Sequence, residues 1–79
     1  MTDSLEAARV SLVDALNEIS SDVERYQAVK ALEVRLDDDF KQIKAKVARN
    51  LYADRTWDQV GEVLGVTGSR AEQISRGAR

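Results

Sequence analysis

Side chains that can hydrogen-bond the edges of nucleic acid bases lie close together near the C-terminus. Arg70 can donate two parallel hydrogen bonds to guanine, Gln73 can pair with adenine, and Glu72 can accept from cytosine or orient Arg70. We therefore predict a set of residues that read DNA bases, consisting of Ser69, Arg70, Glu72 and Gln73. The alternative is that Glu72 and Arg76, four residues apart on a helix, form only a surface ion pair.

A second set of residues could hold the phosphate backbone. Basic side chains and amides at a helix N-terminus bind phosphate, and Gly68 has no side chain to keep the backbone away from it. The predicted phosphate contacts are Thr67, the Gly68 amide, Arg76 and Arg79, followed by Arg55 and Lys44.

Both sets need a helix held out from the protein, and residues 55–76 predict two short helices joined by a tight turn. Gly65 is expected to end the first helix in the left-handed conformation, which glycine adopts without a steric penalty. Gly61 is expected to let the second helix cross closely, with the small Ala71 opposite it. Val60, Leu64, Val66 and Ile74 are predicted to close a small core beneath the crossing.

Capping residues mark where the two helices begin. Thr56 has Gln59 three residues later, the spacing of a capping box. For the second helix either Thr67 or Ser69 can be the N-cap, and Ser69 has Glu72 at capping-box spacing.

The run TWDQVGEVLGVTGSRAEQISRG (residues 56–77) resembles the helix-turn-helix of small actinobacterial and phage regulators. That motif is similar to region four of sigma factors, in which T-W-x-x-(I/V)-G-x-x-L-G-V-(S/T) precedes the recognition helix. The preceding DVERYQAVKALEVRL is more loosely similar to the long helix of those regulators. The resemblance implies a DNA-binding transcriptional regulator whose second short helix enters the major groove.

The chain departs from that family at the start of the recognition helix. Gly68 and Ser69 stand where the family often carries Arg or Gln, so the family's base preference does not transfer. Nothing resembles the core-binding or promoter-melting regions of a sigma factor, which excludes a complete sigma factor.

The first fifty residues predict a helical hairpin. Apolar residues from Leu5 to Ile19 recur at three and four spacing on one helix, which begins at an Asp3 N-cap and ends near Ser20. Ser21 and Glu24 form a second capping box, and a long helix of roughly 45 Å should follow from Asp22 to Ala53. Only its first half can be covered by the first helix, so its second half should pack on the two short helices. A break at residues 37–39 is the alternative, because three Asp in succession are poor helix formers.

Two aromatic residues lie where the long helix meets the short ones. Trp57 could be mistaken for a base-stacking residue, but we expect it in the core. The Tyr52 hydroxyl could reach a phosphate, or its ring could cover Trp57.

Charge is distributed unevenly along the chain. Residues 1–40 carry ten acidic and four basic side chains, a net charge of −6, whereas residues 41–79 carry eight basic and four acidic ones, a net charge of +4. A basic half with a helix-turn-helix suits phosphate contact, and the acidic half should point away from DNA. The alternative is the mixed charge of ordinary solvated helices.

Val10, Val13 and Val34 lie off the apolar stripes of their helices. Single exposed valines are common. A chain of 79 residues, however, buries little surface, and the two DNA-binding motifs of a dimer bind a two-fold symmetric site more tightly than one motif does. We therefore predict that these valines form the surface of a homodimer or of a partner contact.

The composition argues against other functions. The chain has no Cys and no His, so neither a disulfide framework nor the usual zinc ligands are present. No phosphate-binding loop or nucleophile with a His partner occurs, and one helical turn cannot direct Asp37, Asp38 and Asp39 at one ion. We expect no enzyme activity, cofactor, metal or small-molecule ligand. Lacking an apolar run near 20 residues, the chain is also expected to have no membrane span.

These observations predict an all-α protein of four helices. Residues 1–53 form the hairpin for dimerisation or partner docking, and residues 54–79 form the helix-turn-helix. The expected function is sequence-selective binding of double-stranded DNA by a homodimer in the cytoplasm, associated with the nucleoid when bound. The alternative is an adaptor whose acidic hairpin docks on RNA polymerase or another protein; a non-specific architectural protein would carry more Lys.

Overall fold

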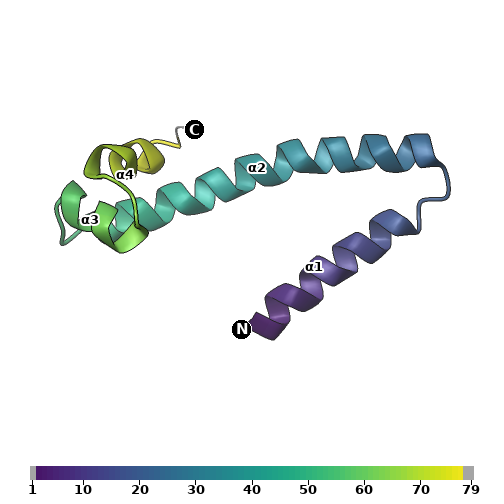
Figure 1. The fold of residues 1–79 in the computed structure, drawn as a ribbon, viewed down its shortest axis with the longest axis horizontal. Coiled ribbons are helices and arrows are strands. Elements are labelled where there is room, and N and C mark those ends of the chain that lie inside the picture. The colour runs from purple at the N-terminus through teal and green to yellow at the C-terminus, as the bar shows by residue number, and fades with distance from the viewer. Residues whose placement is uncertain (1, 78–79) are drawn as a thin grey trace. The chain divides into compact units, whose positions relative to one another are not determined.

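The chain is all-α in a computed structural model that describes residues 2–77 (Figure 1). The described residues form four helices: α1 (Thr2–Asn17), α2 (Asp22–Tyr52), α3 (Trp57–Leu64) and α4 (Gly68–Ser75). This confirms the predicted fold class. No helix in the described range is both long and apolar enough to cross a membrane.

Two compact units make up the chain, the N-terminal unit (Met1–Arg35) and the C-terminal unit (Leu36–Arg79). Their boundary lies inside α2, so the last part of this helix belongs to the same unit as α3 and α4. The sequence predicted a functional boundary between residues 53 and 54. That boundary differs from the structural one inside α2, and it stays a prediction.

Helix α1 differs from the prediction at both ends. It already begins at Thr2, which places Asp3 in the first turn, where a carboxylate interacts favourably with the helix dipole. It ends at Asn17, three residues before Ser20. On its surface the Arg9 guanidinium hydrogen-bonds Glu6 and lowers the pKa of that carboxyl group.

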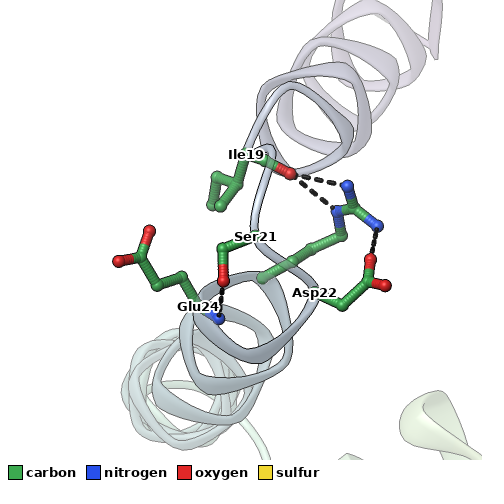
Figure 2. A network of polar contacts seen from close by, with 5 residues as sticks. Ile19, Ser21, Asp22 and Glu24 are labelled. Carbon is green, nitrogen blue, oxygen red and sulfur yellow. Dashed lines mark hydrogen bonds and ion pairs between the residues drawn. The ribbon is translucent and has the colours of Figure 1, made fainter.

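The turn between α1 and α2 is held by side-chain hydrogen bonds. The Glu24 amide donates to Ser21 Oγ at 3.3 Å, one of the two hydrogen bonds of the predicted capping box (Figure 2). The reciprocal hydrogen bond, from the Ser21 amide to the Glu24 carboxylate, is not formed between these two described residues. The Arg25 guanidinium donates to the Ile19 carbonyl at 2.6 and 3.1 Å and to Asp22 Oδ1 at 2.9 Å. Arg25 thus joins the start of α2 to the turn before it.

Helix α2 continues through the three consecutive Asp residues without a break. Lys41 Nζ lies 2.9 Å from Asp37 Oδ2, one helical turn away. This ion pair compensates part of the low helix propensity of aspartate. The predicted continuity of the long helix is therefore confirmed, with its end at Tyr52.

Apolar side chains of the N-terminal unit remain largely exposed to solvent. Leu5 is 74%, Val23 67% and Tyr26 66% exposed, and none of residues 3–35 is buried. The α1 stripe was predicted to cover the first half of α2, but two helices joined by a short turn enclose no side chain fully. This unit therefore has apolar surface without a covering element.

The buried core lies in the C-terminal unit. Val60 of α3 and Ala71 of α4 are fully buried, and Ala45 and Ala48 of α2 are buried as well. The small side chains on α2 allow close packing, and Arg49 donates a 2.8 Å hydrogen bond to the Ser75 carbonyl at the end of α4. The second half of α2 thus packs on the two short helices as predicted, but through Ala45, Ala48 and Arg49. Its large apolar side chains do not make this contact fully, because Phe40, Ile43 and Val47 stay 53%, 60% and 42% exposed.

Candidate nucleic-acid interface

Both short helices begin at the threonine residues that their spacing indicated. The Gln59 amide donates to Thr56 Oγ1 at 3.3 Å, and the Thr56 amide donates to Gln59 Oε1 at 2.9 Å, which completes the predicted capping box. At α4 the Arg70 amide donates to Thr67 Oγ1 at 3.1 Å. Of the two predicted caps for α4, Thr67 is therefore correct, and Ser69 lies inside the helix.

These caps allow a direct stability test at the start of α4. Thr67→Ala should lower the free energy of unfolding by about 1 kcal/mol, because the Arg70 amide loses its acceptor. Ser69→Ala should change it by less than about 0.5 kcal/mol, because Ser69 is an exposed helical residue. Urea unfolding followed by circular dichroism measures both, and an equal loss in the two variants would contradict the cap assignment.

Two glycines set the path of the turn between α3 and α4. Gly65 ends α3 with a φ of 76°, the left-handed conformation that the sequence predicted. A Cβ on Gly61 would lie 2.6 Å from the Val66 carbonyl oxygen and 2.7 Å from the Thr67 carbonyl carbon. The closest approach at Gly61 is therefore made by the turn backbone up to Thr67, the residue that caps α4, and the position of Ala71 opposite Gly61 stays a prediction.

Gly68 lies close to the start of α3. A Cβ at this position would lie 3.1 Å from the Asp58 amide nitrogen and 3.2 Å from the Asp58 Cα atom at the start of α3. This contact is a structural reason for a glycine beside the predicted close approach of a phosphate, which stays a prediction. The Gly68 amide, in the first turn of α4, stays a predicted phosphate contact.

Helix α4 has one buried face and one solvent face. Ala71 and Ser75 are buried, and Ser75 Oγ donates to the Glu72 carbonyl at 2.5 Å. Sequence reasoning missed the inward position of Ser75, whose only signal was its spacing of four from Ala71. The predicted base-reading residues Ser69, Glu72 and Gln73 are exposed, as is Arg76, and Arg70 is half-buried.

Two of the predicted base-reading residues are in contact. Arg70 Nη1 donates to Gln73 Oε1 at 3.4 Å, a long hydrogen bond that joins their side chains on the solvent face. Glu72 and Arg76 do not form the alternative ion pair among the described residues. The Arg70 guanidinium and the side-chain amide of Gln73 therefore lie next to each other on α4.

The predicted phosphate contacts are in several different environments. Thr67 is exposed but uses its hydroxyl as the α4 cap, and Arg79 lies outside the described residues. Arg55 donates to Asp54 Oδ1 at 2.9 Å and to the Leu51 carbonyl at 3.4 Å, so its guanidinium already has local acceptors. Lys44 lines an apolar groove formed with residues of α3 and α4.

The aromatic residues pack on each other. The rings of Tyr52 and Trp57 are stacked, with centroids 3.9 Å apart and an angle of 10° between their planes. Trp57 is half-buried, so it lies at the edge of the core. One face of its ring is covered by Tyr52. Of the two roles considered for Tyr52, its ring does cover Trp57.

The valines predicted for a dimer or partner surface are exposed. Val10 and Val13 are each 42% exposed, and Val34 is 65% exposed. They are not distinctive in this respect, because Leu5 and Tyr26 on the apolar stripes are also exposed. Exposure alone therefore does not single out the three valines as an interface.

Among residues 2–77, no group of three or more His, Cys, Asp or Glu side chains is placed to hold a metal ion. Asp37 is paired with Lys41. No family model matches the chain, and neither a curated protein nor a solved structure is significantly similar to it.

Proposed function

We propose that this protein binds double-stranded DNA in a sequence-selective manner, with α4 in the major groove, and regulates transcription as a homodimer. The observation that carries this proposal is the solvent face of α4, on which Arg70 contacts Gln73 while Ala71 and Ser75 anchor the opposite face. A helix held on a small rigid support, with polar side chains facing outward, fits the width of the major groove.

The side chains on α4 suit direct reading of bases. Arg70 can donate two hydrogen bonds to the O6 and N7 atoms of guanine, and Gln73 can bond the N6 and N7 atoms of adenine. The two side chains are neighbours on α4, since Arg70 Nη1 lies 3.4 Å from Gln73 Oε1. Glu72 and Ser69 flank them as further readers of the sequence.

Backbone contacts and net charge support the same function. Arg76 is exposed at the end of α4, and the Gly68 amide is in its first turn. The net charge of +4 over residues 41–79 attracts phosphate and speeds encounter with DNA. In this proposal the protein acts in the cytoplasm, on the nucleoid, and Arg79, Arg55 and Lys44 are secondary phosphate contacts.

Selection of bound duplexes from a random-sequence pool tests this function. The experiment uses near-physiological salt and excess non-specific competitor, because phosphate contacts alone give salt-sensitive binding to any sequence. Enrichment of an inverted repeat supports both sequence-selective binding and the homodimer. Failure to enrich any sequence would contradict the proposal.

Substitutions on α4 should separate base reading from phosphate contact. Arg70→Ala or Gln73→Ala should cost about 1–3 kcal/mol of binding free energy on the selected site and relax preference at one base pair. Arg76→Ala should weaken binding to all duplexes alike and reduce the salt dependence. Fluorescence anisotropy on the selected site and on single-base variants measures both effects, and identical behaviour of all three variants would contradict the assigned roles.

A second candidate function is an adaptor that docks on RNA polymerase or another protein. It is favoured by the net charge of −6 on residues 1–40 together with the exposed Leu5, Val23 and Tyr26. An acidic surface with apolar side chains suits a basic, apolar partner surface. Binding of purified RNA polymerase without any DNA preference would favour this function over the first.

A further inference from the structure

An exposed apolar stripe runs along the part of α2 that belongs to the C-terminal unit. Its members, which we call the α2 stripe, are Leu36, Phe40, Ile43 and Val47. Their alternating spacing of four and three residues keeps them on one side of the helix, and it is the spacing of side chains that face a second helix. Phe40 is 53%, Ile43 60% and Val47 42% exposed, so within its own unit the stripe is not covered.

The α2 stripe continues into an apolar groove beside the core. The groove has a volume of about 330 Å³ and is lined by Ile43, Lys44, Val47, Leu64, Val66 and Ile74. Two of these residues, Ile43 and Val47, are shared with the stripe. Contiguous exposed apolar surface of this kind is typical of a protein contact.

Charged residues flank the α2 stripe, and on each flank the sign of the charge reverses after seven residues. Asp39 and Lys46 lie on one flank, because residues seven apart fall on nearly the same side of a helix. Asp37 and Lys44 lie on the other flank in the same way. All four side chains are exposed, and Asp37 is paired with Lys41. The other three form no ion pair with any described residue.

This order of charges makes the face complementary to a second copy of itself that runs in the opposite direction. When Phe40 of one chain is level with Ile43 of the other, the acidic end of each stripe lies beside the basic end of its neighbour. Asp39 then meets the second copy's Lys46 on one flank, and Asp37 meets the second copy's Lys44 on the other. A parallel second helix would instead place acidic end beside acidic end and basic end beside basic end, and flanking charges of this kind set the orientation of paired helices.

We propose that the α2 stripe binds the α2 stripe of a second copy of this chain in an antiparallel arrangement. The two-fold axis passes between residues 41 and 42, and each contact is made twice. The exposed ring of the second copy's Phe40 lies level with Ile43, where the groove opens. Lys44 belongs to this contact rather than to the phosphate contacts. The inference specifies the homodimer of the proposed function and rests on that part of it, but it does not depend on DNA binding.

Exchange of the flanking charges tests the contact and its direction. Sedimentation equilibrium at low salt and without DNA should show that the natural protein is a dimer. Asp39→Lys and Lys46→Asp should each raise the dimer dissociation constant about tenfold, because each variant brings two like-charged pairs together. The double variant should return to within about threefold of the natural protein. In a parallel pair Asp39 would lie nearest the second copy's Lys44, and the double variant would stay weak.

Two further variants separate the stripe from the rest of α2. Asp38→Lys is the matched control, because Asp38 is an exposed aspartate on another side of the helix, and it should change the dissociation constant by less than about twofold. Ile43→Asp should raise it by at least about tenfold, since two carboxylates would enter the centre of the apolar contact. Ile43 is 60% exposed, so this variant should keep its helix content and the fluorescence of Trp57.

A monomeric natural protein, an unchanged dissociation constant for Ile43→Asp, an equal effect of Asp38→Lys and Asp39→Lys, or a double variant that stays weak would overturn the inference. These results are independent of DNA selection. Restored dimerisation of the double variant in a protein that selects no DNA sequence would support the contact and reject only the DNA-binding function. Selection of a single unrepeated site by a monomer would reject the contact and keep DNA binding.

Discussion

Val60→Asp is expected to unfold the C-terminal unit at neutral pH. Val60 is completely buried in α3, so the substitution places a carboxylate where no water or partner can solvate it. The expected loss of about 4 kcal/mol or more equals what a core of this size contributes to folding. Fluorescence of Trp57, the single tryptophan, reports on this unit because its ring stacks on Tyr52.

The control for this prediction lies on the same helix. Val63 is 59% exposed, and Val63→Asp should change the free energy of unfolding by less than about 0.5 kcal/mol. Burial raises the pKa of a carboxyl group in the folded state, so the Val60→Asp variant should recover stability as the pH falls toward about 4. Similar unfolding curves for the two variants at pH 7 would contradict the position of the core.

Gly61→Ala is expected to cost about 2 kcal/mol, although alanine is the better helix former. The added methyl group would lie 2.6 Å from the Val66 carbonyl oxygen and 2.8 Å from that of Thr67, and both belong to the backbone. The turn must therefore move, and the strain of about 1–3 kcal/mol outweighs the gain in helix propensity. Because the turn positions the start of α4, binding to the selected DNA should weaken as well.

Gly65→Ala provides the comparison for that prediction. A Cβ at Gly65 would have nothing within 4 Å, so its cost comes only from the left-handed φ of 76° and should be about 1 kcal/mol. Chemical unfolding of both variants gives the order of the two costs. A smaller loss for Gly61→Ala than for Gly65→Ala would contradict the close contact between α3 and the turn.

Local signals in the sequence determined the four helices and most of their ends, although both ends of α1 differ from the prediction. The caps at Thr56 and Ser21 depend on hydrogen bonds to residues three positions away, Gln59 and Glu24, and the structure contains a capping hydrogen bond at each. The end of α3 depends on the left-handed backbone of Gly65, which is also found as predicted. The long helix predicted from Asp22 onward continues across residues 37–39 as expected. These features depend on residues near one another in the chain, so spacing was sufficient.

The candidate site was predicted only in part. The outward positions of Ser69, Glu72 and Gln73 followed from helical periodicity, and the structure has them exposed. The hydrogen bond between Arg70 and Gln73, and the local acceptors of Arg55, depend on side-chain conformations that spacing does not specify.

Only the tertiary structure decided which surfaces meet. In the structure the backbone of the turn lies against Gly61, and the start of α3 lies against Gly68. These contacts depend on how the two helices cross, which the spacing of residues does not specify. The tertiary structure also left the α1 stripe exposed and opened the groove beside Ile43 and Val47. The sequence by itself determined which residues are apolar and on which helix face they lie; how much of each face is covered depends on packing between distant segments, which local periodicity does not encode.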